Sequence, residues 1–223
     1  MDVLVVIPHA DDEILGCGGT LAKHVACGDH VHALVVTRGA KELFTLKERT
    51  RTRAELKRAH KVVGIKGCYF LDFPAPKLDN VPNHKIADEI KKVLSSVKPS
   101  IVYLPHRGDI HVDHKAVYNA TLVAARPTRG DYISKLLSYE TLSETDWASP
   151  SAEDAFVPTV YVDISSHIET KLKAMECYQS KLKPPPHPRS LDALRALARL
   201  RGSTVGFEWA EAFMLVREKI GPM

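Results

Sequence analysis

Short apolar runs alternate with helix-like segments along the first half of the chain, and this alternation limits the folds that the chain can adopt. The apolar runs cover residues 2–7, 30–37, 68–71 and 100–104, and the helix-like segments cover residues 12–28, 46–63, 85–97 and 111–125. Strands that alternate with helices predict a parallel sheet covered by helices on both faces. We therefore expect an α/β fold with a Rossmann-like, mostly parallel sheet.

The second half of the chain has a less regular pattern. We expect strands at residues 135–141, 159–164 and 212–217, helices at residues 165–181 and 191–200, and a proline-rich break at residues 183–188. The first of these helices would start at a serine cap. A chain of 223 residues, 44% of them hydrophobic, can bury one sizeable core. The sequence thus predicts a single domain over residues 1–223 with a less regular C-terminal part.

Polar segments directly follow two of the predicted strands. PHADDE occupies residues 8–13, after the first strand, and HVDH occupies residues 111–114, after the fourth strand and its loop. In a doubly wound sheet of order 3-2-1-4, the first and fourth strands are neighbours, and ligands bind at the carboxyl ends of the strands where the order reverses. We therefore expect the two segments to line one pocket, although they lie far apart in the sequence.

The residue types in these segments are those of a metal site. His9 and Asp12 are three residues apart at a strand-to-helix turn, and His111 and His114 are three apart on a predicted helix face. Two histidines and one carboxylate form a catalytic zinc set that leaves a position open for water. Asp11 and Asp12 are adjacent and cannot easily point the same way, so one can bind the metal while the other acts as a general base. The pattern predicts metal-dependent hydrolysis.

Other interpretations fit some of these residues. Asp11, Asp12 and Glu13 are also favourable acids for the first turn of a helix. Two histidines and a carboxylate also occur in non-haem iron oxygenases. A nucleotide-binding module is a further class, but the glycines at residues 16–21 lack the third glycine of the dinucleotide fingerprint.

At these residues the sequence resembles the LmbE-like deacetylases, which include the PIG-L-type N-acetylglucosaminyl deacetylases. The PHPDDE pattern of that family stands here as PHADDE, with Ala10 in place of the second proline, and its HxDH pattern stands intact as HVDH. Weaker matches lie at residues 16–19, 36–39, 53–55 and 210–213. The resemblance therefore covers most of the chain.

The resemblance implies a set of site residues. A zinc ion would be bound by His9, Asp12 and His114. Asp11 would be the general base. His111 would stabilise the oxyanion or donate a proton to the leaving amine, Asp113 would orient a neighbouring histidine, and Arg53 would contact the substrate near its acetyl group.

The resemblance also implies a reaction, the removal of an acetyl group from an N-acetylated sugar of the N-acetylglucosamine type. The alternative is another N-acylated small molecule, such as an amino acid conjugate or an antibiotic intermediate. Lys181 stands where family members often carry a glutamine, so the contribution of that segment to substrate recognition stays open. For Tyr178 we favour core packing, and Glu13 and residues 184–188 receive no role.

Three loop residues border the predicted pocket: Arg38, Arg107 and Asp109. For each of them we favour a solvated surface position over contact with a sugar or a phosphate.

The charge pattern bears on possible partners. The formal net charge is +4, and basic residues gather only at residues 41–58 and 189–201, where acidic or apolar residues interrupt them. This pattern is typical of solvated helix faces and does not indicate nucleic-acid binding. No apolar run approaches the roughly 20 residues that cross a bilayer, and no signal peptide is recognisable. We expect a cytoplasmic protein with a small-molecule partner, without a membrane partner, and we leave a homo-oligomer open.

Overall fold

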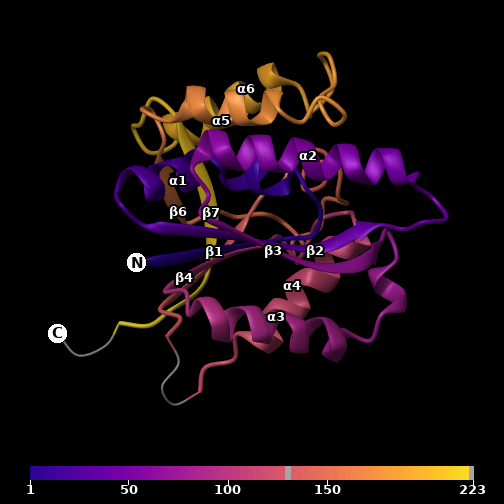
Figure 1. The fold of residues 1–223 in the computed structure, drawn as a ribbon. Coiled ribbons are helices and arrows are strands. Elements are labelled where there is room, and N and C mark those ends of the chain that lie inside the picture. The colour runs from indigo at the N-terminus through magenta and orange to yellow at the C-terminus, as the bar shows by residue number, and fades with distance from the viewer. Residues whose placement is uncertain (129–131, 221–223) are drawn as a thin grey trace.

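A seven-stranded sheet forms the middle layer of the computed structural model, which describes residues 1–128 and 132–220 (Figure 1). The strands are β1 (Asp2–Ile7), β2 (His30–Gly39), β3 (Gly67–Ala75), β4 (Ile101–Pro105), β5 (Lys135–Tyr139), β6 (Val160–Asp163) and β7 (Ala210–Glu218). Their order across the sheet is β3-β2-β1-β4-β5-β7-β6. Strands from β3 to β5 run parallel, and β7 is antiparallel to both β5 and β6. The mostly parallel α/β sheet and its 3-2-1-4 core are confirmed.

Helices cover both faces of this sheet. They are α1 (Asp12–Ala26), α2 (Leu46–Val63), α3 (Asn83–Val97), α4 (Val112–Ala124), α5 (Ile168–Glu176) and α6 (Leu191–Ser203), with a short 3-10 helix at Leu78–Asn80. In Figure 1, α1, α2, α5 and α6 lie above the sheet, and α3 and α4 lie below it. Two apolar cores result, one on each face.

The first strand shows why a continuous apolar run folds this way. Val3, Val5 and Ile7 belong to the core beneath α1 and α2, whereas Leu4 and Val6 belong to the core against α3 and α4. All five side chains are fully buried. Each contributes about 1.5–3 kcal/mol of hydrophobic stabilisation, and both faces of the strand must be apolar because helices cover both.

One predicted helix is wrong in its extent. The segment 165–181 forms a helix only over Ile168–Glu176, and its N-cap residue His167 makes no side-chain capping bond. The hydroxyl of Ser165 instead binds Asp163 Oδ1 at 2.6 Å. Beyond Glu176, the chain leaves the helix because polar groups there bind buried carboxylates, as at Ser180, whose backbone N–H donates to Glu55 Oε1 at 3.1 Å. Tertiary hydrogen bonds outweigh helix propensity here.

The pairing of β1 with β4 places the ends of these strands side by side. Val3 is in register with Ile101, and Val5 with Tyr103. The loops after the two strands therefore meet at the carboxyl edge of the sheet.

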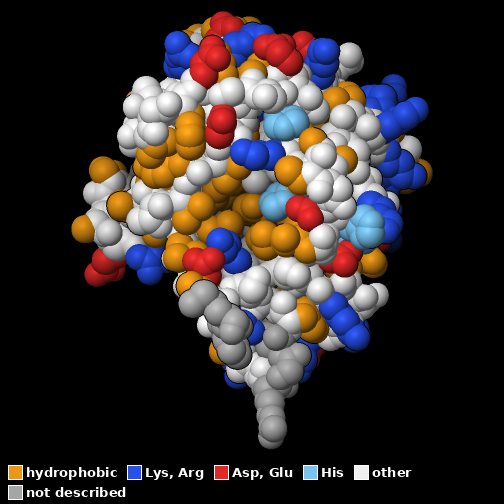
Figure 2. Space-filling view, turned by 90° about the vertical axis from the view of Figure 1, so that its left-hand side faces the viewer, with side chains coloured by type: hydrophobic (Ala, Val, Ile, Leu, Met, Phe, Trp, Pro, Cys, Tyr) orange, Lys and Arg blue, Asp and Glu red, His pale blue; other side chains and the backbone are white. Residues whose placement is uncertain are grey.

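Figure 2 shows the side of the molecule opposite this edge, which lies at the left of Figure 1, where β1 begins. Hydrophobic side chains gather near the centre of that view. Among the described helices, none is both long and apolar enough to cross a membrane.

Candidate metal centre

The turn after β1 presents two aspartates in different directions. Asp11 is the N-cap of α1 and has a φ of 118°, in the left-handed region, where a non-glycine residue costs about 1–3 kcal/mol. The carboxylate of Asp12 folds back over the turn, and its Oδ2 accepts the backbone N–H of His9 at 2.8 Å. The carboxylates of Asp11 and Asp12 thus point in different directions, which allows one to bind a metal and the other to act as a base.

The start of α4 supplies the second half of the site. His111 is the N-cap, and its Nδ1 accepts the backbone N–H of Asp113 at 3.1 Å. His114 lies one turn later and is fully buried. The ring centroid of His111 is 4.5 Å from that of His9 and 5.6 Å from that of His114. The structure therefore brings the histidines of both predicted segments together.

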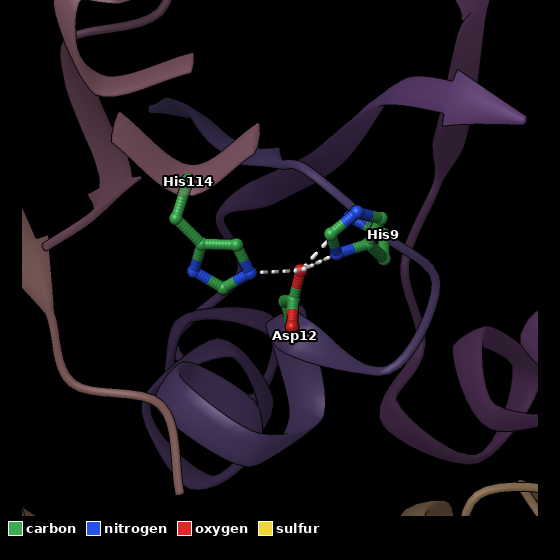
Figure 3. Close-up of side chains that lie close together, drawn as sticks. All are labelled: His9, Asp12 and His114. Atoms are coloured by element: carbon green, nitrogen blue, oxygen red, sulfur yellow. Dashed lines mark hydrogen bonds and ion pairs between the residues drawn. The ribbon is translucent and has the colours of Figure 1, made fainter. Parts of the chain in front are cut away.

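His9, Asp12 and His114 converge on one point (Figure 3). Asp12 Oδ2 lies 3.5 Å from His9 Nδ1 and 3.3 Å from His114 Nε2. One ligand atom from each residue lies within 4.8 Å of the others. Among the described residues, Asp12 Oδ1 and His114 Nε2 are buried without a hydrogen-bond partner. Buried polar atoms without partners are costly, and nitrogen and oxygen donors suit a zinc ion, so the three residues fit a metal.

Each candidate histidine ligand is held by a carboxylate of its own. Asp113 Oδ2 lies 2.9 Å from His9 Nε2, which leaves Nδ1 directed at Asp12. Asp109 Oδ2 lies 2.7 Å from His114 Nδ1, and Thr145 donates to Asp109 Oδ1 at 2.6 Å. Carboxylates in this position fix the ring orientation of metal-binding histidines. The geometry fits the orienting role expected of Asp113.

Asp109 was not predicted to take part. The sequence pattern favours a solvated position for it, yet the structure buries it completely. A carboxylate two residues before HVDH is the only signal in the sequence that could have indicated this contact.

The charges of the cluster shift its pKa values strongly. Burial lowers the pKa of His114, but Asp12 and Asp109 outweigh burial and raise that pKa to about 10. Burial, together with the neighbouring His9 and His114, lowers the pKa of His111 to about 4. Burial also raises the pKa of Asp11 above its usual range. His111 is therefore neutral at pH 7.

Arg189 connects the proline-rich segment to the site. Its Nη1 donates to Asp11 Oδ2 at 3.1 Å, its Nη2 to Glu144 Oε1 at 2.9 Å, and its Nε to Ser143 Oγ at 2.7 Å. The carboxylate of Asp11 is only 1% exposed, so the guanidinium compensates a buried charge. Sequence patterns gave no indication of Arg189.

Glu13 and Tyr178 stabilise the turn between β1 and α1. Glu13 is fully buried. Its Oε1 accepts a hydrogen bond from the Tyr178 hydroxyl and lies 3.2 Å from His60 Nε2. Its Oε2 accepts the backbone N–H of Asp11 at 3.2 Å. Tyr178 is fully buried, in agreement with the expected core packing. Its hydroxyl has the further task of holding Glu13.

Arg53 stands apart from the histidine–carboxylate cluster, in a pocket whose wall also includes His9 and Ala10. Its Nη2 donates to Asp72 Oδ1 at 2.8 Å, and its guanidinium lies 3.8 Å from the centre of the Phe70 ring. The structure thus places Arg53 beside the site without joining it to the proposed metal ligands.

A family model described as PIG-L, GlcNAc-PI de-N-acetylase, matches residues 4–125. The chain belongs to the PIG-L family. Among the relatives of this PIG-L protein, the uncharacterized deacetylase YaiS of Escherichia coli is 32% identical over 183 residues, covering 80% of this chain and 90% of YaiS. The diacetylchitobiose deacetylase of Thermococcus kodakarensis is 28% identical over 96% of this chain and 82% of its own length.

A solved structure extends the similarity to the whole fold. The conserved protein TT1542 from Thermus thermophilus superposes with a TM-score of 0.77 at 27% identity, covering 100% of this chain and 97% of the other. The resemblance inferred from PHADDE and HVDH is confirmed.

Proposed function

We propose that this PIG-L protein is a zinc-dependent hydrolase that removes an acetyl group from an N-acetylated sugar of the N-acetylglucosamine type. The observation that carries the proposal is the convergence of His9, Asp12 and His114, in which His114 Nε2 is buried without a hydrogen-bond partner among the described residues. The family match and relatives that are named as deacetylases support the reaction type. A relative named for diacetylchitobiose supports the sugar.

His9, Asp12 and His114 would hold the metal. When bound there, a zinc ion supplies Lewis acidity, which acidifies water and polarises an amide carbonyl. Asp113 and Asp109 keep the rings of His9 and His114 in the orientation that binding requires.

Asp11 is the proposed general base. Its carboxylate is buried, and the raised pKa that burial produces makes it a stronger base than an exposed aspartate. Asp11 takes a proton from the attacking water as the new carbon–oxygen bond forms at the acetyl carbon. The proton then passes to the amide nitrogen as the carbon–nitrogen bond breaks, which gives acetate and a free amine.

His111 is the proposed donor to the oxyanion. Because its Nδ1 accepts the backbone N–H of Asp113, the neutral ring carries its proton on Nε2. A neutral imidazole with Nε2–H is suited to donate a hydrogen bond to the oxygen on which negative charge develops. Of the two roles considered for His111, the tautomer favours this one over proton transfer.

An acetate-release screen tests the proposal directly. Zinc-loaded protein is incubated with N-acetylglucosamine, its oligomers, its glycosides and phosphates, and an N-acetylated amino acid, and the metal content is measured on the same sample. We expect acetate from at least one sugar, no activity after chelation, and recovery when zinc is restored. Acetate only from the amino acid would replace the proposed substrate class, and no acetate from any compound would contradict the proposed reaction.

A further inference from the structure

A pocket lined by basic side chains lies next to His9. Four of the residues in its wall are cations, Arg38, Arg49, Arg53 and Lys181, and they come from β2, α2 and the segment after α5. A second depression along α2 shares Arg38, Arg49 and Arg53 with the first and adds Lys57. Basic groups thus line a continuous region that starts at a proposed metal ligand.

Acidic groups neutralise the pocket wall only in part. Arg38 Nη1 and Arg53 Nη2 share one carboxylate, Asp72, at 3.7 and 2.8 Å. Glu48, the acid in the pocket wall, is held by the backbone N–H and hydroxyl of Thr45, and these hydrogen bonds lower its pKa. The four cations of the wall therefore face two carboxylates, which leaves an excess of two positive charges.

Two of the cations carry that excess. Within the part of the chain that the structure describes, neither the guanidinium of Arg49 nor the ammonium of Lys181 forms a hydrogen bond or an ion pair, and Arg49 Nε is buried without a partner. Lys181 lies near enough to Asp11 to act against the raised pKa of that carboxyl, but Asp11 is already paired with Arg189. A buried N–H donor without an acceptor is costly. An anion in the pocket would satisfy it.

Apolar side chains also line the pocket, alongside Thr37 and Thr52. Leu56 and Phe70 contribute apolar surface, and Arg53 stacks on Phe70 at 3.8 Å. A fixed guanidinium over an aromatic ring loses little freedom on binding. The pocket therefore offers apolar surface and threonine hydroxyls beside positive charge, which suits a sugar-like body that carries an anionic group.

We propose that this pocket binds an anionic group of the substrate, a carboxylate or a phosphate on an N-acetylated small molecule, with Lys181 and Arg49 as its main contacts. The proposal rests on the deacetylase function proposed above, because it is the position of the pocket beside His9 that makes its occupant part of the substrate. It adds two contact residues, Lys181 and Arg49, and a preference for charge that the metal-site residues do not assign.

Calorimetry on zinc-loaded protein tests the proposal without depending on turnover. The ligands are N-acetylglucosamine, its 1-phosphate, its 6-phosphate and its malate glycoside, so the phosphate and carboxylate arms are separated. We expect at least one anionic ligand to bind about tenfold or more tightly than the uncharged sugar, a difference that one well-placed charged contact supplies. Added salt should reduce that preference.

Matched variants attribute the preference to the pocket. Lys181→Gln and Arg49→Gln should each reduce the affinity for the anionic ligand about three- to tenfold, a larger loss than for N-acetylglucosamine. Lys183→Gln is the control, because Lys183 is exposed two residues along the same segment and does not line the pocket.

Two results would overturn the inference: equal affinity for charged and uncharged sugars, or a preference that survives both substitutions in the pocket. Either result together with acetate release would contradict the anion pocket and leave the proposed function standing. Absence of acetate release from every sugar would contradict the proposed function, whatever the calorimetry shows.

Discussion

Arg189 Nη1 and Asp11 Oδ2 are 3.1 Å apart, and this hydrogen bond joins two parts of the chain separated by 178 residues. The bond matters because Asp11 is buried, and a buried carboxylate needs compensation to remain charged. Arg189 is itself fixed by Ser143 and Glu144, so it offers Asp11 a donor in a set position. The proposed base is thus oriented by the segment that follows the proline-rich break.

Replacing Arg189 should slow catalysis. Arg189→Ala removes the donor, and we expect kcat to fall at least about tenfold because the buried carboxylate loses its partner. Arg189→Lys should retain part of kcat, since an ammonium restores the charge but not the planar fork. Steady-state kinetics on folded, zinc-loaded variants measures this, with Arg195→Ala, an exposed arginine, as the control. An unchanged kcat in Arg189→Ala would show that the bond does not position the base.

Asp11 and His114 should separate catalysis from metal binding. Asp11→Ala should keep its zinc and lose about 10²–10⁴ in rate, because it removes the proton acceptor only. His114→Ala should lose zinc, because it removes a ligand. Metal analysis and acetate release on the same preparations distinguish the two. An empty Asp11→Ala protein together with a fully loaded His114→Ala protein would reverse the assigned roles.

Tyr178 should contribute to stability through its hydroxyl. Tyr178→Phe leaves buried Glu13 without one of its donors, which should lower the free energy of unfolding by about 1–3 kcal/mol. Urea denaturation measures the change. Tyr161→Phe is the control, because the hydroxyl of the partly buried Tyr161 makes only a 3.4 Å bond to the Pro158 carbonyl. An equal decrease in the free energy of unfolding in the two variants would mean that the hydrogen bond to Glu13 does not contribute more to stability than the one from Tyr161 to Pro158.

The sequence predicts the framework of the site because that framework depends on local patterns. The alternation of strands and helices sets the order of the first strands, and the neighbouring positions of β1 and β4 bring His9 next to His114. The order of the strands is thus sufficient to place the PHADDE and HVDH segments next to each other. These features follow from periodicity and from the rules for connecting parallel strands.

The contacts that support the site could not be predicted in this way. Asp109 lies in a loop, and nothing in a local pattern distinguishes a buried loop carboxylate from a solvated one. Arg189 reaches Asp11 through the course of an irregular segment. The helix expected at residues 165–181 ends early, and the backbone N–H of Ser180 beyond it donates to distant Glu55.

Asp109 should act through His114 on metal affinity. Asp109→Ala removes the carboxylate that lies 2.7 Å from His114 Nδ1, and we expect zinc affinity to fall about 10–100-fold. Competition with a chelator of known affinity measures the change. Asp88→Ala on the exposed face of α3 is the matched control. Equal affinity in wild type and Asp109→Ala would remove Asp109 from the metal centre.

Zinc binding should release protons. In the metal-free protein the pKa of His114 is about 10, so the ring is protonated at pH 7 and must lose a proton before Nε2 can bind an ion. The pKa of His9 is also raised, because Asp113 and Asp12 outweigh its burial. We expect release of about one to two protons per zinc and, as pH falls, an affinity that drops about tenfold per pH unit for each proton released. Calorimetry at pH 7 in two buffers of different ionisation enthalpy measures the number released. Identical heats in both buffers would mean that no proton leaves, which would contradict a protonated His114 in the metal-free protein.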